Sequence, residues 1–290
     1  MRKGIVMNYI NELSSSANEM LHSACKKNTI NNKAEIIEIL KTNDLPISDA
    51  VVNLQAKYGG ISYRFSDISL KGFEIDLFDY DPERKLYKVR YTQKFQEEIA
   101  FNCMNYHYAG DFGNFINESG QILKFSMGKL SVIADTIEEF LESEAVKYQF
   151  LKEQNQWFER GFYLKEFRDW ITNEEIGLYK LEKHSNRYKQ WYTNKEEDIF
   201  IEYINHDYEI NGGSVFIKNK TAMLRLYNNL IKSSGYPFSA TYNFNENYIE
   251  IFGVIKNDSS NQKYYCQTFE KINNPIGNEP IDVFYYMSGV

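Results

Sequence analysis

The chain has 290 residues, twice the roughly 150 residues of an average domain, so its length predicts two domains. Its 33 basic and 40 acidic residues give a net charge of −7, which argues against a nucleic-acid binder and favours a basic protein partner. Neither a membrane-spanning apolar stretch nor a signal-peptide core is recognisable, and the three cysteines (Cys25, Cys103 and Cys266) are far apart. We therefore expect a cytoplasmic protein with buried thiols, no disulfides and no cofactor.

The first sixty residues are predicted to be mainly helical. Apolar residues near a 3.6-residue period indicate helices on both sides of a polar break at 28–32. A sharper signal follows, because Pro46 ends the preceding helix and Ser48 is a good N-cap for the next one. That helix should bury Tyr58 and end at Gly59 and Gly60, where glycine allows a left-handed residue.

From Gly60 to Phe125 the apolar period falls to about two, which predicts an antiparallel meander. A tight turn is expected at Ser119 and Gly120, since glycine permits the backbone geometry of a hairpin. The predicted strands are 61–65, 72–81, 85–91, 114–119 and 122–126.

A well-marked amphipathic helix is predicted after the sheet, at 134–151. Asp135 is the expected N-cap, with Glu138 at the capping-box position, and Phe140 and Leu141 lie on the apolar face. The first domain, 1–154, is therefore predicted to be α+β, with N-terminal helices and an antiparallel sheet closed by this C-terminal helix.

The second domain, 155–290, is also predicted to be α+β, without an internal repeat of the first. A polar and aromatic helix is expected at 152–171. Another helix is expected in the segment 221–235, with Gly235 just past its end. The predicted strands are 199–204, 214–217, 238–244, 247–255, 264–269 and 283–287.

No motif for metal or nucleotide chemistry is convincing. His22 with Cys25 and Cys103 with His107 have helical spacing, but the two pairs are far apart and a structural zinc site needs four ligands together. The triplet at 111–113 spells the magnesium-binding motif of protein kinases, yet the other kinase motifs are missing. We predict no metal site.

The acidic stretch from Asp67 to Glu83 is the best functional lead in the raw chemistry. It has six acidic residues against one basic residue, Lys71. Such a stretch is typical of a solvated strand end, and two of its carboxylates could also hold a divalent cation, but clustered acids on a sheet can also steer a basic protein. The candidate partner-binding residues are Asp76, Asp79, Asp81 and Glu83.

The order of these signals resembles the SUKH superfamily, bacterial immunity proteins related to a yeast cell-wall-synthesis regulator. The resemblance covers about residues 40 to 150, and it is carried by the segments 46–48, 54–60, 110–116 and 133–142 and by the turn at Gly120. It implies an α+β domain in which these residues are fold determinants: Ser48, Tyr58, Gly59, Gly60, Gly120, Asp135, Phe140 and Leu141.

The resemblance also implies a function without catalysis, in which the chain binds and neutralises a cognate toxin, commonly a nuclease or nucleic-acid deaminase. The toxin is expected to be basic, with no direct contact to nucleic acid or membrane, and a homodimer is a further expectation. Two alternatives remain at this point: a scaffold or signalling protein, and an enzyme. The enzyme would place its site in the second half, on His184 or His206 with the acids Glu196, Glu197 and Asp198.

Overall fold

The computed structural model describes much of the chain in detail. The described residues are 12–64, 72–105, 113–126, 128–152, 158–163, 177–205, 212–218, 222, 226, 241–244, 248–256 and 262–271. Several predictions lie outside them: the strand at 283–287, His206, His107 and most of the helix at 221–235, of which only Ala222 and Leu226 are described, both helical.

The chain divides into two units, Met1–Gln149 and Phe150–Val290. The predicted boundary after residue 154 lies close to this division. The described residues contain four α-helices and antiparallel sheets, so the architecture is mixed α and β as expected. In the second unit the described elements are mainly strands, with a 3₁₀ turn at Glu182–His184, the last residues of α4 (Ile137–Lys152) and two helical positions, Ala222 and Leu226.

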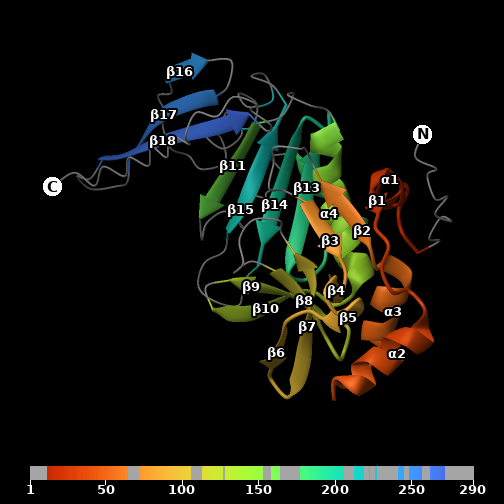
Figure 1. The fold of residues 1–290 in the computed structure, drawn as a ribbon. Helices are drawn as coiled ribbons and strands as arrows, with labels where there is room; N and C mark the ends of the chain where they lie inside the picture. Colours follow the sequence, from red (N-terminus) through yellow and green to blue (C-terminus); the bar gives the residue numbers. More distant parts are fainter. Residues whose placement is uncertain are drawn as a thin grey trace. The chain divides into compact units, whose positions relative to one another are not determined.

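The α-helices are α1 (Ser15–Ser23), α2 (Lys33–Thr42), α3 (Asp49–Tyr58) and α4 (Ile137–Lys152). Figure 1 shows α1, α2 and α3 grouped together in the first unit. Each of these three begins at a polar side chain that accepts a hydrogen bond from the first turn of the helix. These N-caps are Ser14, Asn32 and Ser48.

Two glycines end α3, and the surrounding backbone explains why. Gly60 has a φ of +82°, and a Cβ atom there would lie 2.4 Å from the carbonyl oxygen of Lys27. Its N–H donates to the Ile75 carbonyl and its own carbonyl accepts from the Lys27 N–H, both at 2.7 Å. A side chain at Gly60 would therefore break the junction between α3 and the strands on either side of it.

The first unit contains an antiparallel sheet in the order β1-β2-β3-β7-β8-β9-β10, with β6 paired to β7. Another pair of strands, β4 and β5, forms a separate two-stranded sheet. The bounds in the larger sheet are β1 Cys25–Lys26, β2 Ile61–Arg64, β3 Gly72–Ile75, β6 Thr92–Phe95, β7 Glu98–Asn105, β8 Gly113–Asn117, β9 Ile122–Ser126 and β10 Lys129–Ala134.

The predicted strands omit β1 and β10 of this sheet, and they differ from it in two further places. The strand expected at 72–81 is two strands, because β3 ends at Ile75 and β4 (Phe78–Asp81) pairs only with β5 (Leu86–Val89) among the described residues. The sequence pattern also missed β6 and β7, although β7 lies in the middle of the sheet. Their turn needs a left-handed Gln96, with φ of 55°, where glycine would have been a clearer signal.

The turn between β8 and β9 contacts the beginning of α3. Gly120 has a φ of +91°, and its N–H donates to the Asn117 carbonyl at 3.0 Å. Ser48 Oγ donates to the Glu118 carbonyl at 2.6 Å, so the residue that caps α3 also holds this turn. A helix start and a hairpin turn, 70 residues apart in the chain, are thereby joined.

The start of α4 lies one residue later than the sequence predicts. Thr136 Oγ1, and not Asp135, accepts a hydrogen bond from the helix, from Glu139 N at 3.2 Å. Glu139 in turn accepts from Asp135 N at 2.9 Å, so Glu139 takes the role expected of Glu138.

The core of the first unit joins the four helices to one face of the sheet. Phe140 and Leu141 of α4 are buried in it, and the Phe140 ring meets Phe73 of β3 edge-on with 5.8 Å between centroids. Tyr58 and Phe101 are also buried there. Because the core includes residues from every helix, α4 is part of the first unit's packing and not a linker.

The second unit contains an antiparallel sheet in the order β12-β13-β14-β15-β11-β18-β17-β16. Trp191 of β13 is fully buried and packs against Phe216 of β15. The strand bounds are β11 Phe158–Tyr163, β12 Leu178–Lys180, β13 Lys189–Asn194, β14 Ile199–Ile204, β15 Gly212–Ile217, β16 Thr241–Phe244, β17 Tyr248–Lys256 and β18 Gln262–Lys271.

The helix predicted at 152–171 is wrong for its middle part. Residues Phe158–Tyr163 form β11, which pairs with β15 along its whole length and with β18 at its start. The pairing of β11 with β15 and with β18 outweighs the helical pattern of its sequence, because the preference of a segment for a strand depends on the strands beside it. The predicted strands at 199–204 and 214–217 correspond to β14 and β15.

Candidate protein-interaction surface and pocket

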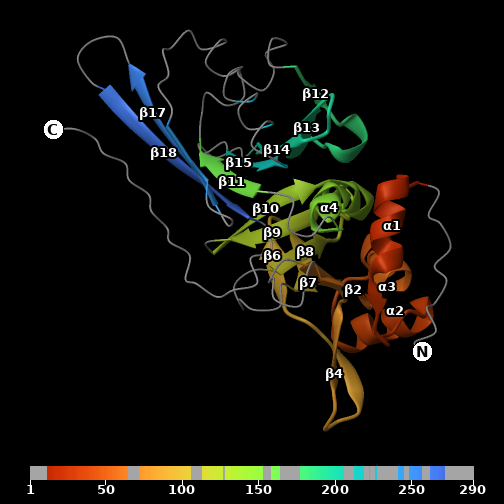
Figure 2. The same cartoon turned by 90° about the horizontal axis from the view of Figure 1, so that it is seen from above.

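The β4–β5 hairpin contains three of the predicted partner-binding residues. Figure 2 shows it extending away from α2 and α3 within the first unit. Its cross-strand pairs, from base to tip, are Phe78 with Val89, Asp79 with Lys88, Tyr80 with Tyr87, and Asp81 with Leu86. Alternate pairs lie on opposite faces, so the two tyrosines continue the face whose base carries Phe78 and Val89.

Large apolar side chains are concentrated on this hairpin and the residues that follow it. Among the residues whose side-chain burial the structure describes, five large hydrophobic side chains are exposed, and three of them lie between positions 80 and 91. They are Tyr80 at 52% exposure, Leu86 at 45% and Tyr91 at 66%. Aromatic residues are enriched in protein interfaces, so this cluster marks a candidate interaction surface. Tyr80 and Leu86 lie on opposite faces of the hairpin, because the pairs Tyr80–Tyr87 and Asp81–Leu86 are adjacent, and Tyr91 follows the end of β5. We call these three exposed residues the hairpin surface.

The four predicted acids do not share one surface. Asp76 is 5% exposed and therefore cannot contact a partner. Asp79 is half-exposed, Asp81 is partly exposed and Glu83 is exposed. Asp81 Oδ1 accepts from the N–H groups of Glu83 and Arg84, both at 3.1 Å, so it shapes the turn at the tip. The sequence pattern predicts a single strand that carries both Asp76 and Asp79. In the structure β3 ends before Asp76 and β4 begins after it, so Asp76 is separated from the other acids.

An ion-pair network holds the base of the hairpin. The Arg90 side chain is 7% exposed, and it donates from Nε to Asp79 Oδ1 at 2.8 Å and from Nη2 to Glu74 Oε1 at 2.9 Å. Lys27 donates to the other carboxylate oxygen of Glu74. Burial alone would raise the pKa of Glu74, but the hydrogen bonds from Lys27 and Arg90 outweigh it and lower the pKa.

A second network ties the same base to α3. Gln55 is fully buried; its Nε2 donates to Asp76 Oδ1 at 3.0 Å and to the Ile30 carbonyl at 2.9 Å, and its Oε1 accepts from Leu77 N at 2.7 Å. Thr29 and the Phe78 N–H also donate to Asp76. Burial of the Asp76 carboxyl is stronger than these hydrogen bonds, so its pKa is raised.

Bases on β5 offset the acidic charge that the sequence stretch suggested. Residues 84–90 include four basic residues and no acidic one. Lys88 lies directly opposite Asp79, and Arg84 and Lys85 are exposed at the tip beside Glu83. The stretch from Asp67 to Glu83 is acidic in sequence, but the hairpin that it enters has mixed charge.

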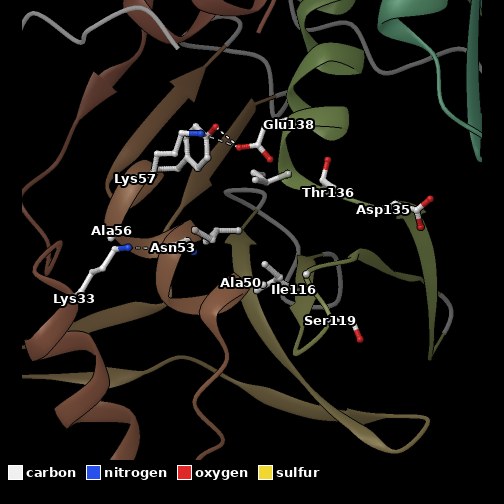
Figure 3. Close-up of a pocket in the computed structure, with 14 residues that line it drawn as sticks. Lys33, Ala50, Asn53, Ala56, Lys57, Ile116, Ser119, Asp135, Thr136 and Glu138 are labelled. Carbon is white, nitrogen blue, oxygen red and sulfur yellow. Dashed lines mark hydrogen bonds and ion pairs between the residues drawn. The ribbon is translucent and has the colours of Figure 1, made fainter. Parts of the chain in front are cut away.

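A pocket of about 550 Å³ lies elsewhere in the first unit, between α3, the β8–β9 turn and the start of α4. Figure 3 shows Lys33, Asn53 and Lys57 on the side of α2 and α3, with Thr136 facing them from the other side. The fold-defining residues Tyr58, Gly120 and Asp135 line it as well. The sequence pattern identified these three as structural residues and gave no sign that they surround one space.

The charged cluster in this pocket is unsuited to proton transfer. Glu138 Oε1 accepts from Tyr58 OH at 2.7 Å and from Lys57 Nζ at 3.0 Å. Burial and then the Glu138 hydrogen bond raise the pKa of Tyr58, whereas the donors to Glu138 outweigh its burial and lower its pKa. A catalytic acid and base need pKa values near the working pH, and these shifts go the other way. The cluster instead ties α3 to α4.

Two acids of the enzyme site considered for the second half, Glu196 and Asp198, contact Asn194 in a turn. Asn194 Nδ2 donates to Glu196 and to Asp198, both at 2.7 Å, so these acids shape the turn between β13 and β14. His184 lies in the 3₁₀ turn Glu182–His184, and His206 lies outside the described residues.

The remaining candidates for chemistry are few in the described part of the chain. Cys103 is buried as expected, and burial raises its pKa, but Cys25 is exposed. No group of three or more His, Cys, Asp or Glu side chains is placed to hold a metal ion among the residues described. Within the same residues, no helix is long and apolar enough to cross a membrane.

Arg90 and Gln55 are the residues that sequence reasoning missed. Each joins segments far apart in the chain, Arg90 reaching Glu74 and Gln55 reaching Ile30 and Leu77. Arg90 lies in a predicted strand, where burial is common. Because a buried arginine is nearly always paired, its position was a signal of an acidic partner.

Comparison of the chain with family models, with curated proteins and with solved structures found no match.

Proposed function

We propose that the chain is an immunity protein of the SUKH type, which binds and neutralises a cognate toxin through stoichiometric protein contact. The resemblance in residues 40 to 150 supports the family and the fold closure by α4. In this proposal the chain is not an enzyme, it acts in the cytoplasm of the cell that makes the toxin, and the toxin is a nuclease or nucleic-acid deaminase.

The hairpin surface is the single observation that carries the binding role. Two exposed apolar side chains, Tyr80 and Leu86, lie on the two faces of a hairpin whose base is held by ion pairs, and a third, Tyr91, follows the hairpin. A rigid support lowers the entropy lost when a surface binds, and exposed tyrosines provide large contact area with few rotatable bonds. Such a surface suits contact with a folded partner better than catalysis.

The hairpin attracts a basic partner less strongly than the net charge of the whole chain suggests. A net charge of −7 still favours a basic toxin through long-range attraction. At the hairpin itself, Glu83 and the half-exposed Asp79 stand beside the exposed bases Arg84, Lys85 and Lys88. We therefore assign affinity mainly to the apolar residues and only steering to the acids.

The test is co-expression with the toxin encoded next to this chain, followed by calorimetric titration of the purified pair. The wild-type chain should protect cells and bind at one to one. Tyr80→Ser combined with Leu86→Ser should weaken binding by at least about a hundredfold, as expected when two interface anchors are removed. Tyr179→Ser is the matched control, because Tyr179 is equally exposed, at 45%, but lies in the second unit.

Two results would contradict the proposal. If the chain neither binds the neighbouring toxin nor protects cells, the immunity role is wrong. If the chain binds but the double variant binds as tightly as the Tyr179→Ser control, the role stands and the hairpin surface is wrong.

A further inference from the structure

The pocket beside α3 has the size of a ligand site and an apolar floor. Its volume of about 550 Å³ falls within the roughly 300–1,000 Å³ typical of small-molecule sites. Leu54, Ile116 and Ile137 line it and are themselves buried, so its floor is fixed by the core of the first unit. All of its lining residues belong to this unit.

Three acceptor atoms around the pocket are already engaged, whereas the second carboxylate oxygen of Glu138 accepts no hydrogen bond from another described residue. Glu138 Oε1 accepts two hydrogen bonds, from Tyr58 OH and Lys57 Nζ. Asn53 Oδ1 accepts from Lys33 Nζ at 2.6 Å, and Thr136 Oγ1 accepts from Glu139 N. A ligand that mainly donates hydrogen bonds would therefore find few acceptors here.

Donor groups, in contrast, are in surplus. An ammonium group has three hydrogens, and Lys33 uses one of them for Asn53. The amide NH₂ of Asn53 and the hydroxyl hydrogen of Thr136 have no acceptor among the described residues. Figure 3 shows Lys33 and Asn53 joined by their hydrogen bond on one wall, with Thr136 on the other.

The charges facing the pocket are also unbalanced. Lys57 is neutralised by Glu138 at 3.0 Å, whereas the ammonium of Lys33 bonds to a neutral amide. Asp135 lines the pocket at its edge, but in Figure 3 its carboxylate points away from the other side chains, and it accepts from Gln121. One positive charge, that of Lys33, is therefore left for a ligand.

We propose that this pocket binds a small organic anion, a carboxylate or a phosphate monoester with an apolar body. Lys33 and Asn53 hold the charged oxygens, and the apolar body lies on the floor formed by Leu54, Ile116 and Ile137. The proposal does not depend on toxin binding, because the pocket and the hairpin surface share no residue.

The test follows backbone amide NMR shifts of the full chain during titration with phenyl phosphate, with benzoate and with neutral benzyl alcohol. Saturable shifts centred on Asn53, Lys57 and Gly120 are expected with at least one anion and not with the alcohol. Lys33→Ala should weaken this binding about tenfold, as the loss of one charge-assisted hydrogen bond predicts. Lys41→Ala, an exposed lysine at the other end of α2, should leave it unchanged.

The two anions distinguish a phosphate monoester from a carboxylate as the ligand of the pocket. Binding of phenyl phosphate alone assigns the pocket to phosphate monoesters, and binding of benzoate alone assigns it to carboxylates. The proposal is overturned if neither anion gives saturable shifts, if benzyl alcohol binds as well as the anions, or if Lys33→Ala binds as tightly as Lys41→Ala.

Discussion

The base and the tip of the β4–β5 hairpin have similar residues but opposite surroundings. At the base, Glu74 and Asp76 are buried, and each of them accepts several hydrogen bonds. At the tip, Glu83 and Lys85 are exposed. The same residue types therefore determine the position of the hairpin at one end and are available for contact at the other.

This difference shows that acidic composition alone does not define a binding surface. A buried carboxylate needs partners, so its charge is used within the fold. An exposed one is screened by salt and by the bases across the strand. Substitutions at the base should therefore change stability, and substitutions at the tip should change binding.

The substitution expected to lower the free energy of unfolding most is the replacement of Arg90. Arg90→Met leaves Glu74 and Asp79 without their shared partner and should lower the free energy of unfolding by about 3–5 kcal/mol. Arg84→Met, at the exposed tip, should change it by less than about 0.5 kcal/mol. Urea unfolding followed by tryptophan fluorescence and circular dichroism measures both. Equal effects of the two variants would erase the distinction between base and tip.

The next effect concerns the link from α3 to the base. Gln55→Ala removes the acceptor of the Leu77 N–H and the donor to the Ile30 carbonyl, and should cost about 3 kcal/mol. Asn53→Ala, two residues away and exposed on the same helix, should cost less than about 0.5 kcal/mol. The same unfolding experiment applies, and a Gln55→Ala variant as stable as Asn53→Ala would show that the link is not needed.

The pH dependence of stability should differ in sign between Glu74 and Asp76. The pKa of Glu74 is lowered on folding, so its stabilising effect is present above its ordinary value of 4.5 and is lost as the pH falls through the folded value. The pKa of Asp76 is raised, so its contribution is greatest below its ordinary value of 3.8 and is lost as the pH rises through the folded value.

Neutral variants separate these two contributions. Relative to wild type, Glu74→Gln should become less stable as the pH rises from 3 to 7, whereas Asp76→Asn should become more stable. Urea unfolding at several pH values in this range gives both slopes. Slopes of the same sign would show that one of the two networks is assigned wrongly.

The smallest expected effect is a charge reversal at the tip. Glu83→Lys should alter the association rate with the toxin by only about twofold, since Arg84 and Lys85 already offset this acid. Stopped-flow mixing at low and at physiological salt measures the rate. A tenfold decrease in the association rate at low salt would instead show that the acids form a contact surface, as the sequence suggests.

Local signals in the sequence predicted much of the first unit. The N-cap role of Ser48 and the left-handed backbone of Gly60 and Gly120 are local, so they could be read without knowing the fold. The contacts of Ser48 with Glu118 and of Gly60 with Lys27 could not be read in this way. The pairing partners of β11 and β7 could not be read, because they come from distant segments. The same reason explains why the helix expected at 152–171 contains a strand.

The candidate site was predictable only in part. The sequence points to the region of Asp79 and Glu83, but it gives neither the burial of Asp76 nor the bases opposite Asp79, which depend on where β3 ends and on strand register. The pocket was not foreseen, since residues as distant as Lys33 and Thr136 meet there.

The separate pairing of β4 with β5 has a consequence for how such a chain can change. Residues 78–89 form their own small sheet, and the groups that fix its base, Glu74, Asp76 and Arg90, lie just outside this segment. A graft that replaces only positions 81–86 would leave the larger sheet intact, together with the Asp79–Arg90 ion pair and the packing of Tyr87 against the core. The tip of the hairpin is thus an exchangeable module, on which new recognition sequences can be installed while the scaffold stays constant.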